Sequence, residues 1–392
     1  MRVVGLFSGI GGLELPFKDR GSVTELLCDV WEPSQKVLKA HFPGVQVKDD
    51  IAKLRTLPKG VNVVTAGFPC TDLSQAGRTA GIRGEASGLV AHVFRLLKKR
   101  DVEWLVLENV RNMLVLDRGQ AMHYLTTELE TLGFRWAYRL VDSRFTGVPQ
   151  RRHRVLLVAS RHHDPRRVLF ADEAGEPAQS SFRSDAFGFY WTEGARGLGW
   201  APDAVPPLKG GSTVGIASPP AVWIPGAKLG RKIVTPTIED AEALQGFERG
   251  WTLPAEVNRT NGPRWKLIGN AVTVGVADWL VGRLLAPGEV CIEEREMPYR
   301  GRWPAAASGA AGKIWQFDAS HWPQRRRYRH LTSVLTLNEV KPLSARATWG
   351  FFNRAYNSPL DIDKDFLRDV EKHAEFMDNV ETPRTRARAA AA

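Results

Sequence analysis

The sequence predicts an α/β protein, with a parallel β-sheet covered by helices on both faces, a smaller region of mostly irregular and β structure, and a C-terminal extension. Three observations support this fold class. In the first 160 residues, short apolar and β-branched runs alternate with segments whose apolar residues recur at helical spacing. From about residue 161 to 230, Gly, Pro and Ser break the chain into short pieces. The composition, 43% hydrophobic and 25% charged over 392 residues, is that of a globular protein with two or three domains.

The first region, residues 1–160, supplies the elements of the sheet. Its predicted strands are Arg2–Leu6, Thr24–Val30, Val61–Ala66, Trp104–Leu107, Arg135–Val141 and Val155–Ala159. Helices are expected between strands, for example at Ser34–His41 and Leu89–Lys99. Because ligands of such sheets bind at the carboxyl ends of the strands, we expect functional side chains in the turns that follow them.

The rest of the chain divides into three further regions that differ in amino-acid composition and pattern. Residues 161–230 form the smaller region of loops and short strands. Residues 231–286 contain helical segments at Ile238–Leu244 and Val272–Leu285 and are expected to complete the first domain. Residues 287–392 form the extension, whose end, PRTRARAAAA, is expected to be disordered.

Charge, cysteine content and hydropathy narrow the function classes. The formal net charge of +11 suits a polyanionic partner, although many proteins that bind no nucleic acid are equally basic. Cys28, Cys70 and Cys291 lie far apart, which predicts neither a disulfide framework nor a metal site, and we expect Cys28 and Cys291 to be buried, inert thiols. No apolar run approaches the roughly 20 residues that cross a bilayer, and no secretion leader is evident, so a cytoplasmic location with no membrane partner is expected.

The first candidate ligand site follows the first strand. The segment LFSGIGG, Leu6–Gly12, reads as a strand entering a glycine-rich turn, where backbone amides can approach a ligand closely. It does not match the dinucleotide pattern GxGxxG, and taken alone it is equally a tight connection. Asp29, at the end of the second strand, can accept hydrogen bonds from ribose hydroxyls, and Asp50–Ile51 can hold an adenine ring. For Asp50 alone, a helix N-cap is the alternative.

Two further segments carry candidate reactive side chains. The segment GFPCTDLSQAG places Cys70 just past an apolar strand, among turn-forming and polar neighbours, where an inert packing role is less expected than for the other cysteines. The segment LENVRNM places Glu108 at the end of a very apolar strand. A carboxylate in such surroundings is costly unless it is paired or protonated, which favours a functional interpretation.

Two basic or turn-forming segments complete the pattern. VPQRRHRVLLVAS places Arg151, Arg152 and Arg154 at the entrance to a strand, which singly is typical of a solvated basic edge. GNAV, Gly269–Val272, places Asn270 at a turn before a helix, where it can tie down loops or reach a ligand.

In this order and spacing, these five segments resemble the motifs of the DNA cytosine-5 methyltransferases of restriction-modification type. TIEDAEALQGF, Thr237–Phe247, resembles a further motif of that family. The resemblance covers residues 1 to about 285 except 161–230, which lie where the family keeps its variable target-recognition domain. It implies a Rossmann-like core that depends on S-adenosylmethionine. The residues that it implies for binding this cofactor are Phe7, Ser8, Gly9, Ile10, Gly11, Gly12, Asp29, Val30, Asp50, Ile51, Pro69, Asn270 and Val272.

The resemblance also implies the chemistry. Cys70 would attack carbon 6 of a cytosine flipped out of duplex DNA, while Glu108, held protonated by apolar surroundings, hydrogen-bonds to or protonates ring nitrogen 3. Carbon 5 would then accept the methyl group, leaving S-adenosylhomocysteine. Arg152 and Arg154 would contact the cytosine oxygen or help to place the base and the cysteine loop, and Thr71–Gly88 would close over the base.

The remaining partner and recognition functions follow from the same resemblance. Residues 161–230 would read the edges of the bases in the major groove, and a cognate restriction endonuclease would act separately. The chain departs from the family at Gly5, where the family often has Asp, and at Thr71, where it favours Gln. Neither departure removes a group that makes or breaks a bond.

Two alternative functions stay open at this point. One is an RNA cytosine-5 methyltransferase of the same fold acting on tRNA, whose characteristic Cys-Phe-Thr stretch is missing from this sequence. The other is a catalytically idle DNA-binding protein that kept the fold, against which Cys70, Glu108 and Arg154 argue.

The extension, residues 287–392, permits two interpretations. Four aromatic residues flank a run of arginines; they are Trp315, Phe317, Trp322 and Tyr328, beside Arg325–Arg327 and Arg329. Such a cluster can be an accessory surface for DNA phosphates, or a small packed domain with solvated arginines.

Overall fold

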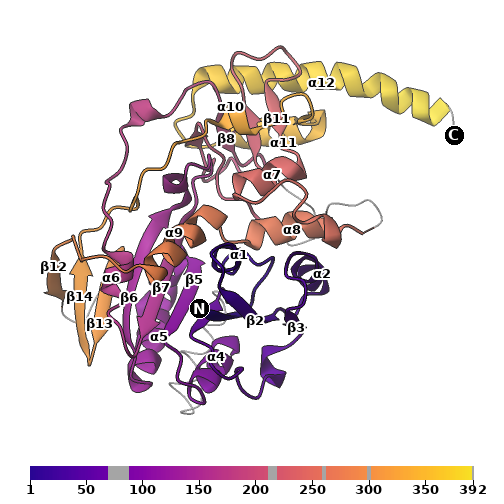
Figure 1. The fold of residues 1–392 in the computed structure, drawn as a ribbon. Helices are drawn as coiled ribbons and strands as arrows, with labels where there is room; N and C mark the ends of the chain where they lie inside the picture. Colours follow the sequence, from indigo (N-terminus) through magenta and orange to yellow (C-terminus); the bar gives the residue numbers. More distant parts are fainter. Residues whose placement is uncertain (69–87, 211–218, 258–261, 298–301, 391–392) are drawn as a thin grey trace.

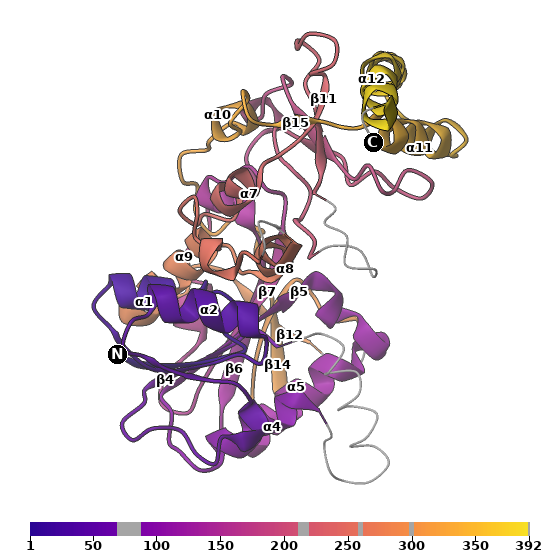
Figure 2. The same cartoon turned by 90° about the vertical axis from the view of Figure 1, so that its right-hand side faces the viewer.

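The computed structural model describes residues 1–68, 88–210, 219–257, 262–297 and 302–390 (Figure 1). Pro69, Cys70 and most of the loop predicted at Thr71–Gly88 lie outside the described residues. The chain forms two lobes, a large one built on the main sheet and a small one above it, which also holds the C-terminal helix (Figure 2).

A ten-stranded sheet forms the centre of the large lobe, with the strand order β12-β14-β13-β6-β7-β5-β4-β1-β2-β3. All six strands predicted for the first 160 residues are present, with shifts of a few residues at their ends. The strands of this sheet are β1 (Arg2–Leu6), β2 (Val23–Cys28), β3 (Gln46–Lys48), β4 (Val63–Ala66), β5 (Trp104–Val110), β6 (Arg135–Asp142), β7 (His153–Ser160), β12 (Glu294–Met297), β13 (Ala306–Ala310) and β14 (Lys313–Phe317).

The sheet is mixed rather than wholly parallel as the sequence predicted. Strands β1 to β5 are parallel, whereas β7 is antiparallel to both of its neighbours, β5 and β6. The connection between β6 and β7 contains only the short helix η4 (Ser143–Thr146). A parallel pair needs a longer crossover, so this short connection reverses the chain direction.

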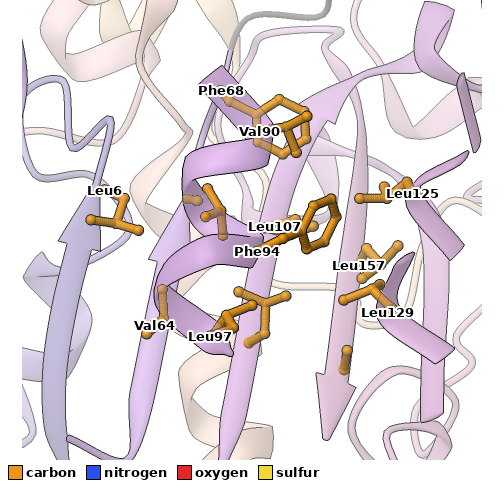
Figure 3. Packing of buried hydrophobic residues seen from close by; sticks show 14 of the residues in the cluster. Leu6, Val64, Phe68, Val90, Phe94, Leu97, Leu107, Leu125, Leu129 and Leu157 are labelled. Carbon is orange, nitrogen blue, oxygen red and sulfur yellow. The ribbon is translucent and has the colours of Figure 1, made fainter. Parts of the chain in front are cut away.

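The alternation of side chains along the strands divides the core into two layers. Val4, Val64 and Leu105 face one layer, which is covered by α4 (Leu89–Leu97) and α5 (Gln120–Thr131) (Figure 3). The adjacent residues of the same strands, Val3, Val63 and Trp104, face the other layer. That layer is covered by α1 (Leu15–Asp19), α6 (Arg166–Leu169) and α9 (Val274–Leu285). The predicted helical cover on both faces is therefore confirmed.

The carboxyl ends of β1, β2, β4 and β5 meet at one edge of the sheet, which we call the functional edge. Strand β1 lies between β2 and β4, so the strands that follow it in the sequence are added to the sheet on both of its sides. Ligands of open α/β sheets bind at such a point, outside the carboxyl ends of the strands.

The small lobe contains a five-stranded sheet that draws on distant parts of the sequence. Its strands, in the order β15-β11-β10-β8-β9, are β8 (Phe187–Phe189), β9 (Ala201–Pro202), β10 (Ala221–Trp223), β11 (Ile233–Thr235) and β15 (Lys341–Pro342). The helices α11 (Ala345–Tyr356) and α12 (Lys364–Ala390) pack against it. Residues 161–230 therefore supply only part of this lobe, because β11 and β15 lie outside that range.

The extension is not a separate unit. Strand β13 pairs with β6 and continues the main sheet, while α10 (Leu331–Val334), α11 and α12 belong to the small lobe. The end of the chain, predicted to be disordered, continues α12 as far as Ala390. The residues 364–381 anchor this helix, since Phe366 and Val370 are fully buried in the small lobe.

Helices α7 (Ile238–Leu244) and α8 (Gly262–Asn270) lie at the junction of the lobes. Helix α7 has the predicted bounds, and the Thr237 and Asp240 side chains form a capping box at its start. The remaining short helices are α2 (Glu32–His41), η1 (Ile51–Lys53), η2 (Arg111–Leu114), η3 (Leu116–Gly119), η5 (Gln179–Ser181) and η6 (Leu253–Ala255).

One segment, Gly262–Leu285, has the length and mean hydropathy of a membrane span, contrary to the expectation that no run approaches this. It consists of two consecutive helices, α8 and α9, and 67% of its apolar window is buried inside the protein. Most of the segment is buried inside the protein, as is usual for core helices, and this burial accounts for its high mean hydropathy.

Candidate active site

A cavity of about 440 Å³ opens at the functional edge of the sheet. Seven of the predicted cofactor residues line it together, namely Phe7, Gly9, Asp29, Val30, Asp50, Ile51 and Asn270. Val30 is 79% exposed, which is unusual for a valine beside a buried sheet. A cavity that combines apolar walls with a few carboxylates fits a nucleoside with an attached charged chain.

The two carboxylates of this cavity are held by backbone amides. Asp29 accepts hydrogen bonds from the Gly9 amide at 2.8 Å and from the Trp31 amide at 2.9 Å. Burial raises the pKa of Asp29, and these two hydrogen bonds oppose the rise. Asp50 accepts from the Ala52 amide at 2.8 Å, so it is the N-cap of η1 and a cavity residue at once.

The glycine-rich turn after β1 has a strained backbone. Phe7 has a φ of 55°, a left-handed conformation that is costly for an aromatic residue, and Gly9 has a φ of 56°. At Gly11, a Cβ atom would lie 2.4 Å from the ring of Phe42, so only glycine fits there. Gly11 combines a positive φ with close packing, a combination that only glycine allows, and so permits this turn.

Five predicted cofactor residues do not line the cavity. They are Ser8, Ile10, Gly11, Gly12 and Val272; of these, Ile10 is 1% exposed and Val272 is 9% exposed. A Cβ atom on Gly12 would lie 3.0 Å from the carbonyl oxygen of Val272. The close approach of Gly12 to Val272 packs the turn against the GNAV segment, and the contact of these five residues with the cofactor stays a prediction.

A buried carboxylate lies beneath the same turn. Glu14 is 1% exposed, and its Oε1 accepts a hydrogen bond from the Thr65 hydroxyl at 2.5 Å. Its Oε2 and the Ser8 hydroxyl have no hydrogen-bond partner among the described residues. A Cβ atom on Gly5 would lie 2.5 Å from both Glu14 Oε1 and Ser8 Oγ. The Glu14 carboxyl thus fills the side-chain space of Gly5, and burial raises its pKa to about 7.

Glu108 and Arg154 form an ion pair at the end of β5. The Arg154 Nε lies 2.8 Å from Glu108 Oε1, and both side chains are largely buried. The pairing of β5 with β7 places the two chain segments side by side at this point. The sequence predicted apolar surroundings that hold Glu108 protonated; the structure places the Arg154 guanidinium beside it, and the protonation of Glu108 stays a prediction.

Asn109 connects this ion pair to the segment that carries the predicted nucleophile. Its side-chain amide donates to the Phe68 carbonyl oxygen at 3.0 Å, and Phe68 is the last described residue before Pro69 and Cys70. The side chain of Asn109 therefore fixes the start of the cysteine segment relative to Glu108. Gly67, one residue earlier, lines the cofactor cavity.

Arg152 has a different environment from Arg154. Its guanidinium donates to the carbonyl oxygens of Leu208 at 3.1 Å, Gly269 at 3.1 Å and Ala271 at 2.8 Å. It is 1% exposed, and burial lowers its pKa well below the usual range. Arg152 therefore joins the chain at Leu208 to the GNAV turn, an arrangement that suits the second of its two predicted roles, placing the base and the cysteine loop.

Several residues at the site were missed by the sequence analysis. Gln245 accepts from the Gln150 side chain at 2.8 Å and donates to the Ala271 carbonyl at 3.1 Å, which fastens α7 to the arginine motif. Lys266 lies over the ring of Trp31 at 4.7 Å, and both line the cavity. Their proximity has no signal in the sequence, because more than 200 residues separate them.

The predictions for the cysteines are confirmed only in part. Cys28 is buried, and burial raises the pKa of its thiol to about 12, which fits the predicted inert thiol. Cys291 is exposed, so its predicted burial was wrong. Within the described part of the chain, no cluster of His, Cys, Asp and Glu is arranged to hold a metal ion.

Comparison with known proteins gives the family. The model of the C-5 cytosine-specific DNA methylase family matches residues 1–185. A type II methyltransferase of Bacillus subtilis (strain 168), M2.BsuMI, is 45% identical over 386 residues, which cover 95% of this chain and 98% of that protein. The chain belongs to the C-5 cytosine-specific DNA methyltransferases. It is therefore an enzyme that uses S-adenosylmethionine, as the sequence predicted.

More distant relatives agree with this placement. The type II methyltransferase M.MspI of Moraxella is 26% identical over 296 residues, which cover 70% of this chain and 68% of that one. Among solved structures, the Dnmt2 methyltransferase of S. pombe superposes with a TM-score of 0.54 at 16% identity, covering 73% of this chain and 98% of that one. At this identity the last comparison concerns the fold alone, which confirms the predicted Rossmann-like methyltransferase core.

Proposed function

We propose that this methyltransferase acts on a cytosine flipped out of a specific duplex DNA sequence, with Cys70 as the nucleophile and Glu108 as the group that binds ring nitrogen 3. The observation that carries the proposal is the contact of Asn109 with Phe68, which brings the start of the cysteine segment to the Glu108–Arg154 pair beside the cofactor cavity. A flipped base held between these three features would face the nucleophile, Glu108 and the cofactor together.

Carbon 5 of cytosine is too weak a nucleophile to react unaided. The Cys70 thiolate adds to carbon 6, which breaks the 5,6 double bond and moves electron density to carbon 5. Glu108 hydrogen-bonds to nitrogen 3 and must carry a proton when it does so.

S-adenosylmethionine, when bound, supplies an electrophilic methyl group to this site. The residues that fit it are Asp29 and Asp50, whose carboxylates line the cavity, and Val30, whose exposed side chain an adenine ring can cover. After methylation, carbon 5 loses its proton to water. The Cys70 sulfur then leaves carbon 6 and the double bond is restored.

Arg154 and Arg152 have different proposed roles, one beside the base and one farther from it. Arg154 contacts Glu108 directly and lies where it can also bind the cytosine oxygen. Arg152 acts through the three carbonyl oxygens that it binds, and so positions the GNAV turn and Asn270 at the cavity.

The small lobe is the proposed reader of the DNA sequence. It is formed by most of residues 161–230, by β11 and β15, and by helices α10 to α12. The short strands β8 to β11 leave their connecting loops to present polar side chains to the major groove. A cognate restriction endonuclease acting separately on the same sequence, and a cytoplasmic location, complete the proposal.

The test is methyl transfer into defined nucleic acids. Tritium from labelled S-adenosylmethionine should enter duplex DNA that contains the target and should not enter tRNA. A duplex with 5-fluorocytosine at the target should trap a covalent adduct on Cys70, because the fluorine on carbon 5 cannot leave as a proton does. Labelled tRNA, or an adduct that forms equally well with the Cys70→Ser variant, would overturn the proposal.

A further inference from the structure

The aromatic and arginine cluster of the extension is used mainly for packing. Arg325 donates to the carbonyl oxygens of Gly175 at 3.2 Å and Glu176 at 3.1 Å, and Arg326 forms an ion pair with Asp278 at 2.7 Å. Trp322 is 4% exposed. These contacts favour the packed alternative for this cluster, so a DNA surface on the extension has to be sought elsewhere.

Two adjoining hollows on the large lobe share Trp303. The larger, of about 690 Å³, lies between η2, β6 and the extension; the smaller, of about 300 Å³, lies between η3, α5 and strands β12 and β14. We call them together the Trp303 groove. Three exposed arginines line it, Arg111 and Arg118 on the wall that follows β5 and Arg302 on the extension.

Among the described residues the groove is positive, although Glu176 forms an ion pair with one lining residue, His321, at 3.3 Å. No Asp or Glu is among the described residues that line either hollow, and Arg111, Arg118 and Arg302 form no ion pair with any described residue. His321 also lines the larger hollow; burial lowers its pKa, and the neighbouring His153 adds to this effect. The positive charge at neutral pH therefore comes from the arginines.

The backbone at the groove is strained in a way that sets the position of Arg118. Asp117 has a φ of 48° and Arg118 a φ of 57°, two consecutive left-handed residues that are not glycine. Each costs of the order of 1 kcal/mol, a cost that folded proteins retain where the conformation is used. The Trp303 indole donates to the Gly119 carbonyl oxygen at 3.0 Å and joins this turn to the extension.

The groove begins at the functional edge. Arg111 follows directly on β5, and Val110, the last residue of that strand, pairs with Arg154. Glu108 lies three residues before Arg111, so a duplex whose target base reaches Glu108 continues past this wall. The second wall belongs to residues 302–305, in the extension.

We propose that the Trp303 groove binds the sugar-phosphate backbone of the DNA duplex on one side of the target base. This inference rests on the proposed function, since it assumes a duplex held at the Glu108 site. Arginine suits the role because its planar guanidinium binds a phosphate through two parallel hydrogen bonds. The contact carries no base information, so it adds affinity equally for target and non-target sequences.

The test is the salt dependence of duplex binding. Wild type, Arg111→Ala, Arg302→Ala and the double variant are titrated with a labelled 30-base-pair duplex over a range of salt concentrations. Each lost phosphate contact should lower the slope of log K against log salt by about 0.9, which corresponds to roughly eightfold weaker binding at 0.1 M salt. In turnover assays the loss should appear in the KM for DNA more than in kcat.

Controls separate charge from folding and from the proposed function. Arg135→Ala removes an exposed arginine at the opposite end of the same sheet and should keep the wild-type slope. Arg111→Lys should restore most of the slope, which a purely steric effect would not. Shortening the duplex on one side of the target, and not on the other, should abolish the difference between the variant and wild type.

The outcomes are distinguishable. Slopes of Arg111→Ala and Arg302→Ala that match wild type, in folded protein, would reject the groove as a DNA contact. Slopes that change equally for single-stranded RNA and duplex DNA would also reject it, because the groove would then bind polyanions without regard to the duplex. If the wild-type protein transferred no methyl group to duplex DNA, that result would overturn the proposed function itself, and not only the proposal that the groove binds DNA.

Discussion

The two lobes differ in how their residues are distributed along the chain. The site on the large lobe is built mainly from short segments at strand ends, so most of its functional side chains sit beside their own strand end, while Asn270 and Lys266 come from α8. The small lobe combines strands at 187–235 with strand β15 and helices from beyond residue 330. The first arrangement positions the reacting groups through short-range chain geometry. The second allows the loops to vary, while helices from a distant part of the sequence hold the core together.

The largest expected effect lies at the nucleophile of the large lobe. Cys70→Ser should abolish methyl transfer, because a serine alkoxide is not available at neutral pH, while cofactor and DNA binding persist. Single-turnover kinetics and gel-shift titration measure the two properties separately. Turnover within tenfold of wild type would contradict a covalent mechanism.

The next effect concerns the partner of the nucleophile. Glu108→Gln should slow the chemical step by about two to four orders of magnitude, the range for lost general acid-base assistance. The glutamine also breaks the ion pair with Arg154, so thermal unfolding of the variant must be measured beside its rate. A rate within threefold of wild type would make Glu108 a structural residue.

The small lobe should respond in stability rather than in chemistry. Phe366→Ala removes a fully buried ring from the cluster with Phe189, Trp223 and Phe351, and should lower the free energy of unfolding by about 3–5 kcal/mol. Tyr356→Ala, on an exposed side chain of α11, is the matched control and should change stability by less than about 0.5 kcal/mol. Similar losses in both variants would mean that α11 and α12 do not form the core of this lobe.

The smallest predicted effect depends on pH. The folded-state pKa of Glu14 is raised to about 7 from 4.5, so its contribution to stability is greatest below pH 4.5 and is lost as the pH rises toward 7. Between pH 5 and pH 8, wild type should therefore lose about 2–3 kcal/mol relative to Glu14→Gln. Denaturant titration of both proteins measures this difference, and the other titrating groups cancel in it. A constant difference across this range would show that Glu14 titrates normally.

The sequence predicted most of the large lobe because its signals are local. LFSGIGG, Asp29 and Glu108 each follow a strand, and the rule that strand ends meet at one edge is enough to bring them together. The opposite direction of β7 was missed because periodicity reports that a strand exists and not which way it runs. Arg152 and Arg154 stand two residues apart and were given the same two alternative roles, yet one binds backbone carbonyls and the other a carboxylate.

The small lobe and the extension were harder to predict for a related reason. Strand β15 has only two residues, and its pairing with β11 joins positions more than 100 residues apart, which no local pattern encodes. The arginines beside Trp322 are conspicuous in the sequence, but their carbonyl and carboxylate partners are visible only in the folded chain. Conversely, Arg111 and Arg302 are unremarkable in sequence and gain their shared surroundings from the addition of β13 to β6.

The packing of Gly5 against Glu14 constrains how this enzyme can diverge. Any side chain at position 5 would overlap the Glu14 carboxyl, and loss of Glu14 alone would leave an empty, partly polar space beneath the cofactor turn. An aspartate at position 5 and a glutamate at position 14 are therefore mutually exclusive solutions to the same problem. A lineage that passes from one to the other has to cross an intermediate that is either overpacked or hollow, so the two positions should change together within the family and seldom singly.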